Sequence, residues 1–208
     1  MVKDHIIIAV SAIAGGGKST IVRKLVELLG DAVPIHFDDY TTAETYPSDF
    51  NAWSESGYDF NEINSPQLAQ HLQALQLGET VPSPANGMTI TPAKYILFEG
   101  PLGRAHQETG QYIDFLVFID TPLEVGLARM ILRATAMPEV TQMTRDELAG
   151  QIDSITELAE SYLVWTRNAY VAQLEQVKPA SDLIVDGTQS VEEITTAIID
   201  ALNEAGLI

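Results

Sequence analysis

A stretch near the start of the chain has the residue types and the spacing of a phosphate-binding loop. Residues 11–20 read Ser-Ala-Ile-Ala-Gly-Gly-Gly-Lys-Ser-Thr. Successive glycines let the backbone bend until several N–H groups point at one anion, and a helix that begins at the lysine adds the positive end of its dipole. Lys18 can then reach the β- and γ-phosphates of a nucleotide, and the hydroxyl of Ser19 can bind Mg²⁺.

The residues on either side supply the context that such a loop needs. Residues 6–10 form a β-branched apolar run, which is typical of a strand buried on both faces. After the loop, apolar residues from Ile21 to Leu29 recur at the spacing of a helix with one apolar stripe. A strand, a glycine-rich turn and a helix that opens on Lys-Ser-Thr indicate a P-loop, with ATP and Mg²⁺ as its ligands. The predicted nucleotide-binding residues are Ala14, Gly15, Gly16, Gly17, Lys18, Ser19 and Thr20.

Residue 12 departs from the P-loop pattern G-x-x-x-x-G-K-[ST], because Ala12 stands where the pattern has glycine. Alanine gives up the freedom to adopt a positive φ, although a methyl group is the smallest obstacle. The start of the chain also resembles a signal peptide, with Lys3 before an apolar run and Ala12-Ile13-Ala14 as a cleavage site. That run is short and follows Asp4, and cleavage would cut the loop, so we reject this interpretation.

Length and composition predict one cytoplasmic domain that covers residues 1–208. With 208 residues and 46% apolar content, the chain can bury a sizeable core. It has no cysteine, which excludes disulfides, thiolate metal sites and a cysteine nucleophile. No apolar run approaches the ~20 residues that span a bilayer, so no membrane role is expected. The net charge of −18 disfavours a nucleic-acid partner and makes each of the few Lys and Arg side chains a candidate for the nucleotide site.

Strand and helix patterns alternate along the chain, as they do in proteins with a parallel sheet between helices. Helical spacing and capping residues predict helices after most of the strands. Residues 134–144 lack periodicity and are expected to form a small lid. We therefore expect an α/β P-loop fold, a three-layer sandwich in which helices cover both faces of a five-stranded parallel sheet. The predicted strands are 6–10, 33–37, 95–98, 115–119 and 183–185.

Acidic residues follow three of the predicted strands, where ligands of parallel α/β sheets bind. Asp38 ends the strand next to the P-loop strand and can orient or deprotonate an acceptor hydroxyl, although Asp38 and Asp39 also suit a simple turn. Glu99 can hold the metal through a water molecule. Asp120 ends its strand as a Walker-B carboxylate would, or it only precedes a helix N-terminus. The sequence leaves open whether Glu99 or Asp120 supports the metal.

Arg129 and Arg133 lie one turn apart on a predicted helix just before the lid. This spacing places both guanidinium groups on one side of the helix, which suits a triphosphate. The alternative is a solvated helix surface. The scarcity of cations in this chain favours a catalytic role for both residues.

Further residues near the predicted strand ends are candidates for the acceptor site. Arg104 and His106 follow Glu99-Gly100 closely, and Asp39 and Tyr40 follow Asp38. Tyr40 can stack on an acceptor ring or pack against the loop. The long polar stretch 41–64 is expected to be a binding loop, with Trp53 as a packing residue. His36 and His71 are expected to be structural.

The chain resembles the uridine kinase / phosphoribulokinase superfamily, which also includes nicotinamide riboside kinase and pantothenate kinase. The resemblance rests on residues 11–20, His36-Phe37-Asp38-Asp39-Tyr40, Phe98-Glu99-Gly100 and 115–133, with later parts at 162–170 and 182–186. It implies that Asp38 is the base toward the acceptor hydroxyl and that Glu99 supports magnesium. It also implies that Arg129 and Arg133 are lid arginines, and that Asp59 holds substrate hydroxyls. Residues 134–144 contain fewer arginines than the lids of uridine kinases, and Ala12 departs from the family's loop.

These patterns together predict an ATP- and Mg²⁺-dependent phosphotransferase that moves the γ-phosphoryl group to a hydroxyl of a nucleoside, a sugar or a vitamin-like alcohol. One alternative is a nucleoside monophosphate kinase, whose anionic acceptor would need more arginines. Another is a regulatory P-loop protein that binds a nucleotide without transfer and would not need the carboxylates at 38 and 99. The sequence leaves open the acceptor, the choice of ATP or GTP, and the oligomeric state, a homodimer included.

Overall fold

The computed structural model of the protein describes residues 4–135 and 144–208. Five strands form one sheet in which all neighbours are parallel, in the order β2-β5-β1-β6-β7. The predicted α/β fold with a five-stranded parallel sheet is therefore confirmed. The strands are β1 (Ile6–Ser11), β2 (Ala32–His36), β5 (Tyr95–Glu99), β6 (Phe115–Asp120) and β7 (Leu183–Asp186).

The register of the central strands brings distant residues to one edge of the sheet. All of β1 is buried, as its β-branched apolar residues predict for a strand covered on both faces. Val10 of β1 pairs with Glu99 of β5, and Glu99 in turn pairs with His36 of β2. The carboxyl end of β5 therefore lies between the end of β2 and the start of the loop that follows β1. The prediction that the strand before Asp38 is next to the P-loop strand is wrong, because β5 separates β2 from β1.

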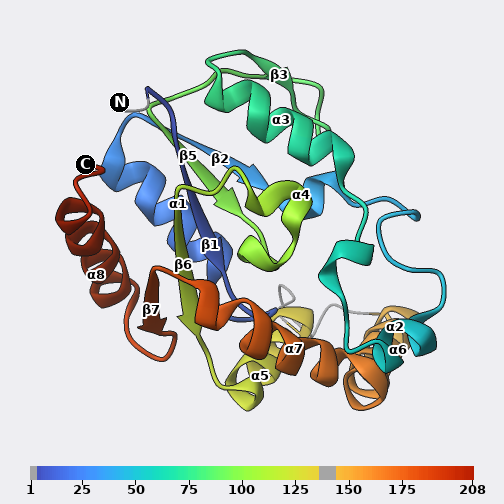
Figure 1. Ribbon diagram of the computed structural model, residues 1–208. Coiled ribbons are helices and arrows are strands. Elements are labelled where there is room, and N and C mark those ends of the chain that lie inside the picture. The colour runs from blue at the N-terminus through green and yellow to red at the C-terminus, as the bar shows by residue number, and fades with distance from the viewer. Residues whose placement is uncertain (1–3, 136–143) are drawn as a thin grey trace.

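Helices cover both faces of the sheet (Figure 1). On one face, α1 (Lys18–Leu29) and α8 (Val191–Glu204) pack their apolar stripes against the strands, with Leu25 and Ile198 fully buried. On the other face, α3 (Pro66–Gln76), the short α4 (Gln107–Gly110) and α7 (Arg167–Gln176) enclose a second core cluster that includes Leu72 and Ala172.

The remaining elements lie mostly around the carboxyl edge of the sheet. Helix α5 (Leu123–Thr135) follows β6, and α2 (Phe50–Glu55) lies within the long segment after β2. Helix α6 (Arg145–Ser161) begins with the capping box of Thr144 and Glu147, and a π-helical turn (Tyr162–Thr166) joins it to α7. A two-stranded hairpin of β3 (Val81–Pro82) and β4 (Thr89–Ile90) lies between α3 and β5.

Most of the lid expected over residues 134–144 lies outside the described residues, because the structure describes nothing from 136 to 143. No helix in the described part of the chain is both long and apolar enough to cross a membrane.

Candidate active site

The loop between β1 and α1 turns through two glycines in the left-handed region of φ. Gly15 has a φ of 73° and Gly17 a φ of 100°, a conformation that residues with a Cβ rarely adopt. A Cβ at Gly15 would also collide with the backbone carbonyl of Gly126 in α5. No side chain caps the N-terminus of α1, whose first N–H groups have no acceptor within the helix. This loop therefore fits an anion such as a nucleotide phosphate.

Ala12 fits this loop without backbone strain. Among the described residues, Tyr58 is the only one other than glycine with a positive φ, so Ala12 does not need the conformation that its methyl group disfavours. The methyl group is fully buried and lies 2.7 Å from where a Cβ of Gly16 would be. Glycine is thus required at 16, where a Cβ would also lie 2.8 Å from the carbonyl oxygen of Ile13.

Lys18 points back into the loop. Its Nζ donates to the carbonyl oxygens of Ala12 at 3.0 Å and Ile13 at 3.2 Å. Burial lowers the pKa of Lys18, while the negative charges of Glu99 and Asp38 oppose that shift. The two carboxylates thus help to keep a buried ammonium group charged beside the glycine-rich turn.

Ser19, Glu99 and His36 form a connected cluster at the carboxyl edge. The hydroxyl of Ser19 donates to Glu99 Oε1, and His36 Nδ1 donates to Glu99 Oε2, both at 2.6 Å. The hydrogen bond to Glu99 raises the pKa of His36 above 6.5 against the effect of burial. Burial acts to raise the pKa of Glu99, but the bonds from His36 and Ser19 outweigh it and hold that pKa below 4.5.

The hydroxyl and carboxylate oxygen atoms of this cluster are the kind of ligand that Mg²⁺ prefers. Within residues 4–135 and 144–208, no group of three or more His, Cys, Asp or Glu side chains is placed to hold a metal ion by itself. A magnesium ion here would therefore need the nucleotide's phosphates as partners, together with Ser19 and Glu99. Asp120, the other metal candidate, instead accepts a hydrogen bond from Lys178 Nζ at 2.6 Å.

A cavity of about 190 Å³, called here the catalytic cavity, brings together residues from the start of α1 and from the ends of β2 and β5. Lys18, Asp38 and Glu99 all line it. Asp38 lies in a 3₁₀ turn (Phe37–Tyr40) directly after β2, and its side chain is exposed. The carboxylate of Asp38 thus shares one cavity with the lysine of the loop. Its other lining residues are Ala14, Phe37, Tyr46, Pro101, Tyr170 and Gln173.

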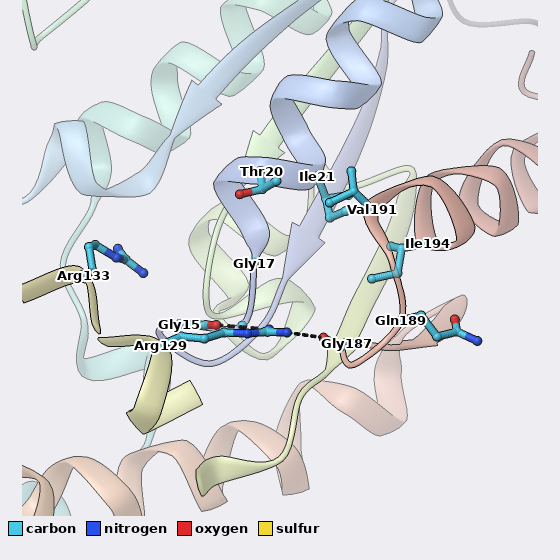
Figure 2. A pocket seen from close by; sticks show the side chains of 11 residues that line it. Gly15, Gly17, Thr20, Ile21, Arg129, Arg133, Gly187, Gln189, Val191 and Ile194 are labelled. Carbon is cyan, nitrogen blue, oxygen red and sulfur yellow. Dashed lines mark hydrogen bonds between the residues drawn. The ribbon is translucent and has the colours of Figure 1, made fainter. Parts of the chain in front are cut away.

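A second cavity of about 280 Å³ also borders the loop (Figure 2). Its wall includes Gly15, Gly16, Gly17 and Thr20 from the loop and α1, and Gly187 and Gln189 from the turn after β7. Arg129 spans this cavity from α5, donating to the carbonyl of Gly187 at 3.0 Å and to that of Gly15 at the outer limit of 3.5 Å. Arg133 lines the same cavity and carries the positive charge that acts on Lys18.

Two basic side chains predicted near the substrate, Arg104 and His106, have structural partners elsewhere. Arg104 donates to Asp182 at 2.6 Å and to the carbonyl of Ala180, so it joins the segment after β5 to β7. His106 is buried, with its ring nitrogens hydrogen-bonded to Thr109 and to the carbonyl of Ile63. Neither side chain lines the catalytic cavity, because both have structural partners.

The other predicted substrate residues also differ from expectation. The hydroxyl of Tyr40 bonds to His71 on α3 at 2.9 Å, so this ring packs into the core. Asp59 accepts a hydrogen bond from the backbone of Asn61 and caps a short 3₁₀ helix. Asp39 is exposed and does not line the catalytic cavity, although its charge acts on His36. Of the acids predicted at the acceptor site, Asp38 alone lines the catalytic cavity.

Sequence reasoning missed the wall opposite the loop, which consists of Tyr46, Tyr170 and Gln173. Gln173 did leave a signal. It stands between Ala169 and Val177 at a spacing of four residues, on the buried stripe of α7. A glutamine on an apolar stripe needs a hydrogen-bond partner. Tyr46 and Tyr170 gave no comparable signal, because aromatic residues in such positions also serve as ordinary packing.

A parallel sheet with a glycine-rich loop between its central strand and a helix, and a carboxylate in the same cavity as the lysine of that loop, defines a nucleotide-binding P-loop protein of the kinase type. The chain belongs to the Phosphoribulokinase / Uridine kinase family, whose profile matches residues 7–192.

Curated relatives agree with this membership, and a solved structure is similar in fold. The chain is 25% identical over 191 residues to a uridine kinase of Deinococcus deserti, with 86% of each chain covered. It is 27% identical over 197 residues to a uridine kinase of Salmonella paratyphi B, again with 86% of each covered. In fold it is similar to a proposed fructose transport system kinase from Silicibacter sp. TM1040, at a TM-score of 0.51 and 15% identity over 88% of this chain and 90% of that one.

Proposed function

We infer that this protein is an ATP- and Mg²⁺-dependent kinase that transfers the γ-phosphoryl group to a hydroxyl of a small molecule. One observation carries this inference: Lys18 at the start of α1, Asp38 just after β2 and Glu99 at the end of β5 line a single cavity. Phosphoryl transfer to an alcohol needs a phosphate cradle, a metal site and a carboxylate beside the acceptor. The catalytic cavity contains a side chain suited to each of these tasks.

Asp38 is the residue that acts on the acceptor in this proposal. Its exposed carboxylate lines the same cavity as Lys18, so a hydroxyl that enters there can donate a hydrogen bond to it. The carboxylate orients the hydroxyl toward the loop and accepts its proton as the oxygen becomes a nucleophile. Exclusion of water from the cavity would favour transfer to the alcohol over hydrolysis.

Ser19, Glu99 and His36 hold the metal side of the site. Bound Mg²⁺–ATP supplies the transferable phosphoryl group and offsets its charge. The Ser19 hydroxyl would hold the metal directly, and Glu99 would support it through its Oε1, which orients that hydroxyl. His36 fixes the other carboxylate oxygen, which keeps Glu99 ionised and correctly turned.

The two arginines of α5 have different tasks in this proposal. Arg129 bridges the carbonyls of Gly15 and Gly187, so it holds the loop against the turn after β7. Arg133 lines the cavity beside the loop and places a cation where phosphate charge develops. Arg129 is thus a positioning residue, and Arg133 contacts the phosphates.

Acceptor-dependent release of ADP tests the proposal. We expect Asp38→Asn to keep the affinity for ATP and to slow transfer by about 10²-fold or more, the scale of general-base catalysis. Asp200→Asn, an exposed change on α8, should leave both quantities as they are. Unchanged transfer in Asp38→Asn would remove Asp38 from the mechanism, and ATP binding without transfer to any hydroxyl acceptor would favour a regulatory P-loop protein.

A further inference from the structure

An apolar cavity adjoins the catalytic cavity. It has a volume of about 190 Å³, and most of its wall is aromatic or aliphatic, with Trp53, Phe60 and Trp165 among the lining side chains. Tyr170 and Gln173 line both cavities, so a molecule held in the apolar cavity lies next to Lys18 and Asp38. Because it lies beside the catalytic cavity, it can hold the body of the acceptor, meaning the part that does not receive the phosphoryl group.

The wall of the apolar cavity carries no charge. Among the described residues, no Asp, Glu, Lys, Arg or His side chain lines it. Burial raises the pKa of Tyr170 to about 12, so this hydroxyl stays neutral. A phosphate or carboxylate on the acceptor would lose its hydration here without gaining a cation. The cavity therefore favours an uncharged molecule with an apolar body.

Gln173 is the polar exception in this wall. It is 5% exposed, and its Nε2 donates to the carbonyl of Pro101 at 2.7 Å. Because a carbonyl can only accept, this bond fixes which end of the amide is which, and Oε1 is left as an acceptor. Oε1 is buried and has no hydrogen-bond partner among the described residues. Such an unpaired oxygen is rare in folded proteins and calls for a ligand or another explanation.

A purely structural role accounts for the amide nitrogen of Gln173 but not for its amide oxygen. The bond from Nε2 fixes the segment after Glu99, but it gives no reason for a buried oxygen without a partner. The terminal torsion of an amide side chain is soft, so a small rotation turns Oε1 further toward the cavity while Nε2 keeps its bond.

We propose that Gln173 determines acceptor specificity: the acceptor is an uncharged molecule whose apolar body fills the apolar cavity and donates one N–H or O–H hydrogen bond to Gln173 Oε1. The hydroxyl that receives the phosphoryl group then points to Asp38. This proposal rests on the proposed kinase activity for the direction of the hydroxyl, but the binding of the body does not depend on transfer.

Matched neutral and anionic compounds test the charge part of the proposal on the unaltered protein. The panel is uridine against its 5′-monophosphate, pantothenol against pantothenate, and fructose as a neutral compound without an apolar body. Binding is measured by thermal shift with ADP and Mg²⁺ present, and transfer by ADP release with ATP. We expect at least one of the two neutral compounds with an apolar body to bind at least tenfold more tightly than its anion and than fructose.

Substitution of Gln173 tests the hydrogen bond. With the best neutral compound as acceptor, Gln173→Met should lower kcat/KM by 10- to 100-fold through a higher acceptor KM, while the KM for ATP stays within twofold. Gln176→Met is the matched control, because Gln176 lies on the same helix and also donates to a backbone carbonyl, that of Gly57, yet lines neither cavity. It should leave both constants within twofold.

A methylated acceptor gives the same test without a variant. If uridine is the acceptor, 3-methyluridine lacks the ring N–H donor and should be as poor for the unaltered protein as uridine is for Gln173→Met, and the two losses should not add. Preference for an anion or for fructose, no binding of either neutral compound with an apolar body, or an unchanged acceptor KM in a folded Gln173→Met would overturn the proposal. Binding of the neutral compound without transfer would leave the role of Gln173 intact and contradict only the kinase activity.

Discussion

Ser19 and Glu99 are 80 residues apart in the chain, yet their side chains meet in a hydrogen bond of 2.6 Å. This bond joins the first turn of α1 to the end of β5 and closes one side of the phosphate loop. It also means that the hydroxyl expected to bind Mg²⁺ is already held in place by a carboxylate.

We expect Ser19→Ala to lower kcat by about 10²-fold or more and to raise the Mg²⁺ concentration needed for half-maximal activity, because a direct metal ligand is lost. A magnesium titration of ADP release measures both effects. Ser154→Ala, which removes an exposed hydroxyl on α6, should leave the titration unchanged. A Ser19→Ala enzyme with the magnesium dependence of the unaltered protein would contradict the assigned role.

The His36–Glu99 pair predicts how stability depends on pH. The pKa of His36 is raised above 6.5, so its contribution is complete below pH 6.5 and is lost as pH rises through the higher folded value. The pKa of Glu99 is lowered below 4.5, so its contribution is complete above pH 4.5 and is lost as pH falls through the lower folded value. The pair therefore stabilises the fold most between these two limits.

Urea unfolding at pH 6 and pH 9 checks this expectation. The free energy of unfolding should fall from pH 6 to pH 9 by more in the unaltered protein than in His36→Gln, which lacks the titrating group. Glu99→Gln should reduce the same difference, because it removes the partner that raises the pKa of His36. Equal pH dependence in all three proteins would show that the pair does not contribute.

The fold was predictable where the sequence pattern and the packing agree. The buried runs at 6–10 and 115–119 could only be strands covered on both faces, and they are β1 and β6. Asp38 and Glu99 could be placed near the loop because the carboxyl ends of parallel strands share one edge of the sheet. This property of parallel sheets predicts where the two residues lie without any knowledge of their side-chain contacts.

The partners of individual side chains were not predictable in the same way. Arg104 and His106 lie close in sequence to Glu99, but backbone carbonyls and Asp182 use their hydrogen-bonding groups. Gln173 lies 74 residues after Glu99 in the sequence, and it lines the same cavity from helix α7. Residue type and spacing predict where a side chain lies on its own helix or strand. They do not predict which side chains of other elements it will contact.

The glycines of the loop should differ in their tolerance of a side chain. Gly15→Ala faces both a positive φ and the carbonyl of Gly126, whereas Gly17→Ala faces a positive φ with nothing within 4 Å. We expect Gly17→Ala to lower the free energy of unfolding by about 1–2 kcal/mol, and Gly15→Ala to lower it by more. Urea denaturation of the two variants gives the comparison, and the reverse order would mean that α5 yields easily at this contact.

Ala12→Gly tests whether the departure from the P-loop pattern matters for function. Because Ala12 needs no positive φ, restoring glycine should leave kcat and the KM for ATP within twofold. It should also lower the free energy of unfolding by about 0.5–1.5 kcal/mol, since a buried methyl group is lost and the unfolded chain gains freedom. A large gain in activity would instead mean that alanine distorts the loop.

The contact between Gly15 and Gly126 joins two main chains with no side chain in between. A Cβ at Gly126 would in turn lie 3.0 Å from the carbonyl oxygen of Ala14, so neither partner has room to yield. Helix α5 is thereby seated directly on the glycine-rich turn, and Arg129 and Arg133 take their positions from that seat. A change that lifts the helix by a fraction of an ångström would misplace both guanidinium groups at once, even if it touched neither arginine.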